Sequence, residues 1–149
     1  MKGVDFTEKV AKEVSVLIPK LIVGIKKSFF EIEELTNRQI IILLFVYENK
    51  RANISDIANN FLVSLPTITG IVDRLVKKGY LERIHDEVDR RVVYVALNDK
   101  GRNFVNKFLV TVKKRWHKIL TFLNLKEQAF YLKILKKIIK ALDEARDEE

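Results

Sequence analysis

The sequence predicts a mainly helical α+β fold, in which six helices accompany one short β-hairpin. Apolar residues recur at helical spacing over most of the 149 residues. The spacing changes near the middle of the chain, where "VVYVAL" is rich in the β-branched residues and Tyr that favour strands. With five Gly and two Pro, the sequence has little that resembles a linker.

Two helices are predicted before residue 50. The first spans residues 5–30. The second begins at a capping box, with Thr36 as the N-cap and Gln39 three residues later, and it continues to about Tyr47. The run "ENKRAN" that follows is predicted to be a loop. The apolar positions of the first helix are Val10, Val14, Leu17, Leu21, Ile25 and Phe29.

Two shorter helices are predicted next, joined by a brief turn. The run "ISDIANNF" indicates the third helix, with Ser55 as its N-cap. Ser64 is the expected cap of the fourth helix, which tolerates Pro66 in its first turn. This helix is expected to run to Lys78, because Gly79 is a natural helix stop.

Residues 80–83 and 91–97 are the predicted strands of the hairpin. Asn98 is expected to cap a fifth helix that runs to about Phe122. A second capping box in "NLKE" starts the sixth helix, which is expected to end near residue 145. Three short helices followed by a two-stranded hairpin describe a winged helix-turn-helix.

The long helices at both ends need a surface against which to bury their apolar stripes. A second copy of the chain is the simplest partner, since two-fold dimers are the commonest oligomers. We therefore expect one compact chain with two functional regions. Residues 33–98 would form the winged helix-turn-helix, and residues 1–32 and 99–149 the helical dimerisation region.

The net charge of +8 suggests a nucleic-acid partner, but its distribution weakens that argument. Residues 102–149 carry twelve basic and six acidic residues, a net charge of +6. Residues 36–101 carry ten basic and eight acidic residues, a net charge of only +2. The case for DNA therefore rests on residue type and geometry within the winged helix, and the C-terminal charge is the ordinary charge of solvated helices.

Several functional classes are disfavoured by what the sequence lacks. The absence of Cys excludes disulfides, thiolate zinc sites and cysteine-based redox sensing. His85 and His117 are isolated, so neither a metal site nor a cofactor is predicted. No phosphate loop, nucleophile elbow or connected catalytic set indicates an enzyme. The first 30 residues do not resemble a signal peptide, and no uncharged run approaches a membrane span, so a cytoplasmic protein is expected.

The predicted fourth helix has one apolar and one polar face. On a helical wheel, Ile71, Val72 and Leu75 fall on the arc that faces a core. Gly70 lies near the centre of the polar arc, where an exposed glycine costs about 1 kcal/mol relative to Ala. That cost is justified if a ligand must approach the backbone. The short hydroxyl side chains, Arg and Lys of this arc suit base edges and phosphates. Besides Gly70, the polar arc contains Pro66, Thr67, Thr69, Asp73, Arg74, Lys77 and Lys78.

The hairpin tip, "HDEVDRRVVYV", offers a second contact. On an extended strand Asp89 and Arg91 would lie on the same side, where the carboxylate can hold the guanidinium by two hydrogen bonds. A fixed arginine at a hairpin tip can enter a narrow minor groove, while Arg90 points the other way towards a phosphate. Asp86 and Glu87 would repel phosphates unless they turn away. A surface ion pair without function is the alternative reading of Asp89 and Arg91.

Residues 35–101 resemble the multiple-antibiotic-resistance regulator (MarR) family of winged-helix transcription factors. The resemblance rests on the order and spacing of "LTNRQ", "ISDIA", "VSLPTITGIVDRLVKKGYLER", "DEVDRR" and the closing "KG". The flanking long helices match the family's dimerisation region in kind. Asn98 stands where the family usually has Thr, and both residues cap helices. The family's cysteine-based peroxide sensing is excluded here, and its clustered zinc ligands are missing.

The resemblance implies a homodimer that binds double-stranded DNA at a pseudo-palindromic operator, as a repressor. The reading helix would place Ser64, Pro66, Thr67, Thr69, Arg74 and Lys77 in the major groove. In the wing, Arg91 would enter the minor groove, held by Asp89, with Arg90 near the backbone. Many members release DNA when a small aromatic acid or phenolic compound binds between the dimer helices and the winged helix. Lys113, Lys114, Arg115 and Lys118 could attract such an anionic effector.

The main alternative is a winged-helix protein–protein adaptor that does not bind DNA. Such an adaptor would carry an apolar patch on the fourth helix, where this sequence has a polar arc from Thr67 to Lys78. The sequence itself cannot name the operator, the regulated genes or an effector.

Overall fold

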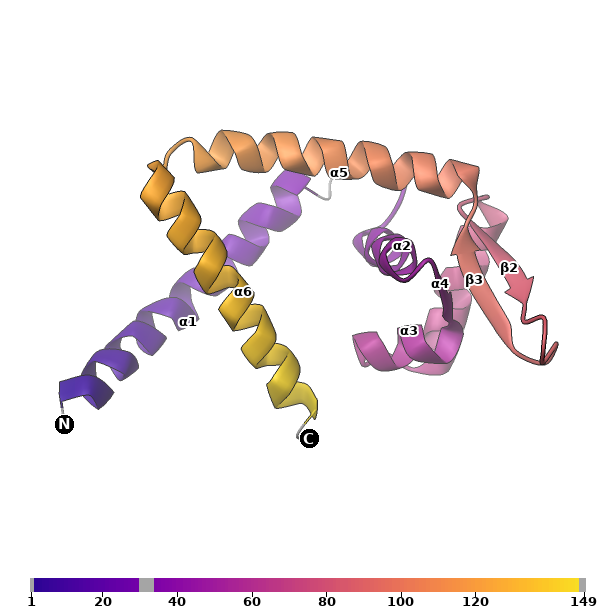
Figure 1. Cartoon of the computed structure of the whole chain (residues 1–149), viewed down its shortest axis with the longest axis horizontal. Helices are drawn as coiled ribbons and strands as arrows, with labels where there is room; N and C mark the ends of the chain where they lie inside the picture. The colour runs from indigo at the N-terminus through magenta and orange to yellow at the C-terminus, as the bar shows by residue number, and fades with distance from the viewer. Residues whose placement is uncertain (1, 30–33, 148–149) are drawn as a thin grey trace. The chain divides into compact units, whose positions relative to one another are not determined.

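The computed structural model describes residues 2–29 and 34–147 (Figure 1). The chain divides into two compact units, Met1–Thr111 and Val112–Glu149. The first unit contains the sheet and all helices up to the first half of α5, and the second contains the end of α5 and α6. The elements are α1 (Lys2–Phe29), α2 (Asn37–Asn49), β1 (Arg51–Asn53), α3 (Ile54–Phe61), α4 (Leu65–Lys77), β2 (Leu81–His85), β3 (Val93–Leu97), α5 (Asp99–Leu120) and α6 (Leu125–Asp147).

The capping signals in the sequence locate the start of three helices correctly. At α2, the Thr36 hydroxyl accepts a hydrogen bond from the backbone N–H of Gln39, and the Gln39 side chain accepts one from the backbone N–H of Thr36. Asn98 accepts from the N–H of Gly101 at the start of α5. The "NLKE" box forms at α6, where the Asn124 side chain accepts from two backbone N–H groups. These predictions are confirmed because each depends on groups within one helical turn.

Two local predictions are wrong. The N-cap of α3 is Asn53, whose side chain accepts a 2.7 Å hydrogen bond from the N–H of Asp56, and Ser55 lies within the helix. The run "ENKRAN" is not a simple loop, because its residues 51–53 form strand β1. β1 pairs antiparallel with β3, so that Ala52 lies opposite Val95. A three-residue strand carries no periodicity of its own, and it forms here because β3 offers a free edge.

The sheet has the order β1-β3-β2, with both pairs antiparallel. β2 and β3 form the hairpin predicted from the sequence, and Figure 1 shows it beside α4. β2 begins one residue later than predicted and ends two residues later, at His85, whereas β3 begins two residues later than predicted and ends at Leu97 as predicted. The register of the hairpin places Leu81 opposite Leu97 and His85 opposite Val93.

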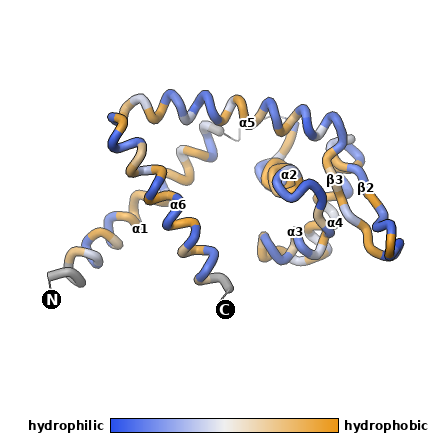
Figure 2. The backbone as a smooth tube through the Cα atoms, viewed as in Figure 1, coloured by the Kyte–Doolittle hydropathy of each residue, from blue (hydrophilic) through white to orange (hydrophobic). Residues whose placement is uncertain are grey.

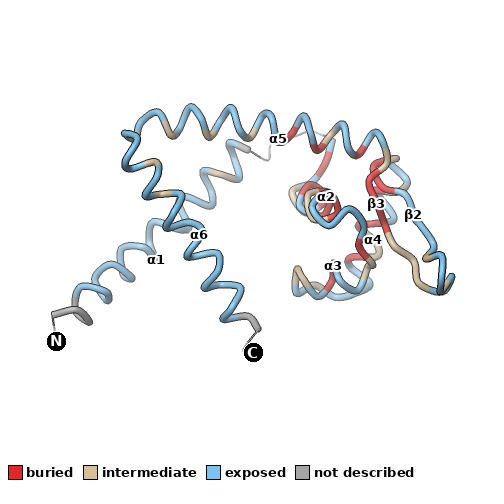
Figure 3. The backbone as a smooth tube through the Cα atoms, in the orientation of Figure 1, coloured by how far each residue is buried: buried red, intermediate tan, exposed pale blue. Residues whose placement is uncertain are grey.

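The core lies between α2, α3, α4, the sheet and the start of α5, where the buried residues of Figure 3 concentrate. The apolar face of α4 packs into this core as the helical wheel predicts. The ring of Tyr80, just after α4, lies 5.5 Å from that of Phe104 in an edge-to-face arrangement. Side chains that are at most 2% exposed include Ile40, Leu43, Ile57, Ile68, Val72, Leu75 and Val95.

The turn after α4 fixes the start of the hairpin. Gly79 has φ of +75°, a left-handed conformation that glycine adopts at little cost. The N–H groups of Gly79 and Tyr80 donate to the carbonyls of Val76 and Leu75, which closes the end of α4. The prediction that Gly79 stops the fourth helix is therefore confirmed.

Helix α1 and the helix α6 of the second unit are mostly exposed to solvent, whereas the winged helix has a buried core. Figure 2 shows apolar and polar residues alternating along α1 and α6, and Figure 3 shows most of both helices exposed. Within the second unit, Gln128 donates to the carbonyls of Leu120 and Leu123, which fixes the α5–α6 turn. The rings of Trp116 and Tyr131 lie 6.3 Å apart.

Candidate nucleic-acid interface

The polar face of α4 is exposed, and its hydroxyl groups are held in place by local hydrogen bonds. The Ser64 and Thr67 hydroxyl oxygens lie 2.8 Å apart, and Thr69 donates to the carbonyl of Leu65 at 2.8 Å. Ser64 is the N-cap of α4 by position, but its side chain makes no capping hydrogen bond to the backbone. The first turn of α4 therefore presents hydroxyl groups in a fixed arrangement.

The basic side chains of α4 lie towards its C-terminal end. Arg74, Lys77 and Lys78 are all exposed. The acidic residue of the same face, Asp73, forms an ion pair with Arg83 on β2. This pair compensates a carboxylate that would otherwise repel phosphates. No motif in the sequence indicates Arg83, because its partner lies ten residues away on another element.

Gly70 lies in the middle of the exposed face with open space around it. A Cβ atom built at this position meets no atom within 4 Å. The packing around Gly70 therefore does not require a glycine, and close approach of a ligand to the backbone stays the predicted reason for it.

We expect Gly70→Ala to increase the stability of the protein by up to about 1 kcal/mol, because alanine favours the helix. We expect the same variant to bind DNA more weakly, because the added methyl group would hold the duplex away from the helix backbone. Thermal unfolding and a DNA titration would check the two effects. Unchanged or tighter DNA binding would show that nothing approaches α4 at this position.

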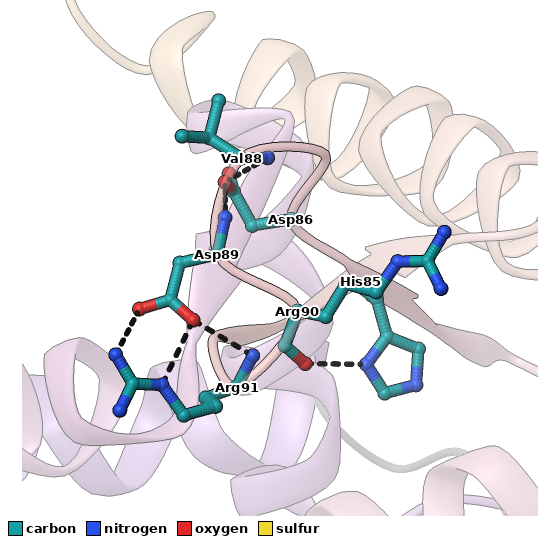
Figure 4. Close-up of polar contacts among 6 residues, drawn as sticks. All are labelled: His85, Asp86, Val88, Asp89, Arg90 and Arg91. Atoms are coloured by element: carbon teal, nitrogen blue, oxygen red, sulfur yellow. Dashed lines mark hydrogen bonds and ion pairs between the residues drawn. The ribbon is translucent and has the colours of Figure 1, made fainter.

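The wing holds the predicted pair of Asp89 and Arg91 (Figure 4). Arg91 Nε donates to Asp89 Oδ1 at 3.1 Å, and a terminal guanidinium nitrogen donates to Oδ2 at 3.3 Å. The Arg91 backbone N–H also donates to Oδ1, at 3.0 Å. These hydrogen bonds lower the pKa of the Asp89 carboxyl, so the carboxylate remains ionised. The side chain of Arg91 is 92% exposed, so it faces solvent while these hydrogen bonds hold it against Asp89.

The prediction that an extended strand brings Asp89 and Arg91 together is wrong. Asp89 and Arg91 do not lie on an extended strand, because β3 begins only at Val93. They lie in a turn that is closed by a hydrogen bond from the Val92 N–H to the Asp89 carbonyl, at 2.9 Å. The turn brings the two side chains together where strand alternation was expected to do so.

The acidic residue Asp86 is turned into the wing loop. Its carboxylate accepts hydrogen bonds from the backbone N–H groups of Val88 and Asp89, at 3.0 and 3.1 Å. These bonds, with the charge of Arg51 4.0 Å away, lower the pKa of Asp86. Asp86 thus organises the loop that carries Arg91. Arg51 was missed in the sequence because β1 was taken for a loop, and its guanidinium also stacks over the ring of Tyr94 at 4.3 Å.

Arg90 and Arg91 point in different directions from the loop, as predicted. Figure 4 shows the Arg90 guanidinium extending away from the Asp89–Arg91 pair. The Arg90 carbonyl oxygen lies 3.1 Å from Nδ1 of His85. His85 therefore has a structural role in the wing, and across the described ranges no three His, Cys, Asp or Glu side chains gather as a metal site.

The C-terminal end of α4 is connected to the chain segment before α2. Lys78 Nζ donates to the backbone carbonyl of Glu34 at 2.7 Å. The Glu34 carboxylate lies 3.7 Å from Lys100 Nζ. Burial, and then the hydrogen bond with Glu34, raise the pKa of Tyr80 to about 12. These contacts orient α4 relative to α2 and α5, and the sequence gave no signal for them because the residues are far apart in the chain.

Three short helices, a hairpin with an exposed arginine and a three-stranded sheet define a winged helix-turn-helix protein. Residues 35–93 match the model of the MarR family. The chain is similar to the uncharacterized HTH-type transcriptional regulator YfiV of Bacillus subtilis, with 29% identity over 110 residues, which are 74% of this chain and 69% of that protein. It is also similar to the transcriptional regulator FarR of Neisseria gonorrhoeae, with 28% identity over 73% of this chain and 75% of that protein.

Solved structures agree in fold. A mutant MarR from E. coli complexed with operator DNA has a TM-score of 0.67 at 25% identity, and the match covers 85% of this chain and 93% of that chain. A MarR family protein from Bacillus stearothermophilus has a TM-score of 0.84 at 21% identity, over 91% of this chain and 97% of that chain. The similarity to the MarR family of transcriptional regulators thus rests on residues 35–93, the winged helix-turn-helix region. None of its described helices is both long enough and apolar enough to cross a bilayer.

Proposed function

We propose that this protein is a sequence-specific transcriptional repressor that binds double-stranded DNA as a homodimer at a pseudo-palindromic operator. The observation that carries the proposal is the wing, where two side-chain hydrogen bonds hold the exposed Arg91 against Asp89. Such an arginine suits a narrow minor groove, while α4 with its hydroxyl and basic side chains suits the adjacent major groove. The E. coli relative in complex with operator DNA supports this reading.

The homodimer is supported by the apolar residues that a single chain leaves exposed. On α1, Leu17 is 57% exposed and Leu21 47%. On α6, Ile138 is 51% exposed and Leu142 65%. Long helices with such stripes are stable when a partner covers them. We assign dimerisation to residues 1–32 and 99–149, and DNA binding to residues 33–98.

We also propose that binding of a small aromatic or phenolic ligand releases the protein from DNA. The winged helix contains a cavity of about 210 Å³ between α2 and the α3–α4 segment. Its lining is apolar apart from one guanidinium, which suits a small aromatic acid. The lining residues are Arg38, Ile41, Ile42, Phe61, Val63, Ile68 and Ile71.

Selection of binding sites from random or genomic duplexes with the purified protein tests the proposal. The expected result is an inverted repeat whose half-sites lie about one helical turn apart. Affinity for the selected duplex should fall steeply as salt rises, because phosphate contacts release counterions. Sedimentation should give a dimer. A well-folded monomer, or no affinity for any duplex, would contradict the proposal, and the latter would favour the protein–protein adaptor.

A further inference from the structure

A groove beside α4 extends the proposed interface towards α2. The groove, of about 790 Å³, is lined by the first residues of α2 and by one edge of α4. Arg38 comes from α2, and Thr67, Arg74 and Lys78 come from α4. Thr67, Arg74 and Lys78 were predicted on the DNA-binding face, whereas Arg38 was noted only as part of the run that caps α2 and was given no role.

The charge of the groove is positive. Its lining contains three basic residues, Arg38, Arg74 and Lys78, and no acidic residue. Within residues 2–29 and 34–147, no acidic side chain forms an ion pair with Arg38 or Arg74. Lys78 donates to a neutral carbonyl, that of Glu34, whose carboxylate pairs with Lys100. The groove therefore attracts anions, and chiefly through its two guanidinium groups.

The groove is continuous with the reading face of α4. Thr67, Arg74 and Lys78 lie within about 40° of one another on the helical wheel, at 100° per residue, so they form one edge of the polar arc. A helix that lies in the major groove, which is about 12 Å wide, has a sugar–phosphate backbone along each edge. The edge of α4 that faces α2 is therefore expected to lie against one of these backbones, with Arg38 on the opposite wall of the groove.

We propose that this groove binds the phosphate backbone of the operator, with Arg38 as a DNA-contacting residue outside the reading helix and the wing. The inference rests on the proposed function and extends it to α2. Arginine suits this role, because its planar guanidinium donates two parallel hydrogen bonds to a phosphate. A phosphate contact fixes the position of the protein on the duplex and carries no sequence information.

The test compares Arg38→Gln, Arg38→Lys and the wild-type dimer in titrations over a range of salt concentrations. Two duplexes of equal length are used, the selected operator and an unrelated sequence. We expect Arg38→Gln to weaken binding to both duplexes by the same factor, on the order of tenfold at 0.1 M salt. The slope of log affinity against log salt should become shallower by about 0.9 for each lost phosphate contact, or about 1.8 for a dimer. Arg38→Lys keeps the positive charge, so its slope of log affinity against log salt should be close to that of the wild type.

Arg102→Ala is a matched control, because it removes an exposed arginine from α5 and lowers the net charge equally. It should leave the slope close to that of the wild type. If the wild type binds its operator and Arg38→Gln keeps both affinity and slope, the groove does not contact DNA. An effect on the operator alone would also overturn the inference, because it would indicate base recognition. If the wild type binds no duplex, the proposed function itself fails.

Discussion

Arg91→Ala is expected to weaken operator binding by about 1–3 kcal/mol for each wing, which is at least fivefold, while the protein remains dimeric. The side chain is 92% exposed, and among the described residues its hydrogen bonds are to Asp89 alone, so its removal disturbs no core packing. Titration of the selected operator at fixed salt measures the loss, and sedimentation checks the dimer. Unchanged affinity in a folded dimer would contradict the role of the wing.

Asp89→Ala distinguishes a positioned arginine from simple charge attraction. This variant removes a negative charge, so long-range electrostatics alone would make DNA binding tighter. If Asp89 positions Arg91, removal of the Asp89 carboxylate leaves the Arg91 side chain mobile in the free protein. DNA binding must then immobilise this side chain, at a cost of about 0.5–1.5 kcal/mol for each wing. We therefore expect weaker binding despite the more positive charge. Asp99→Ala serves as the control, because it removes the same negative charge from an exposed aspartate that pairs with a neighbouring arginine, Arg102.

Features that depend on neighbouring residues were predictable from the sequence. The capping residues Thr36 and Asn98 and the stop at Gly79 act within one turn of a helix, so short motifs identify them. The apolar and polar faces of α4 followed from its periodicity. The pairing of Asp89 with Arg91 was also predictable, although a turn, and not a strand, brings the two residues together.

Features that depend on distant residues were not predictable in this way. Strand β1 exists because Arg51 lies opposite Ala96, a pairing across most of the winged helix. The ion pair of Asp73 with Arg83 requires the hairpin to fold back against α4. Arg38 reads as an ordinary surface residue of α2 until the groove places it opposite Arg74. In each case the contact forms only in the tertiary structure, so no short sequence motif predicts it.

The role of Gly101 also depends on residues that are distant in the sequence. Its substitution is expected to have the largest effect on the stability of the protein. This glycine lies in the first turn of α5, where the chain passes close to the end of α4. A Cβ atom at this position would lie 2.1 Å from the carbonyl oxygen of Tyr80 and 3.0 Å from Cδ2 of Leu97. The carbonyl belongs to the backbone and also accepts a hydrogen bond from the N–H of Asn98, so it cannot move aside independently. A glycine is required here by the close approach of two backbone segments.

Gly101→Ala should therefore destabilise the protein by about 3 kcal/mol, at the upper end of the usual cost of overpacking. Alanine normally favours a helix over glycine by about 1 kcal/mol, so helix propensity acts in the opposite direction and cannot explain a loss. Thermal unfolding at equal protein concentration measures the change, at roughly 2–4 °C for each kcal/mol. Gly70→Ala is the matched control, because the same methyl group meets open space there and should raise stability. Equal stability of the two variants would mean that α5 does not start against Tyr80 as the structure places it.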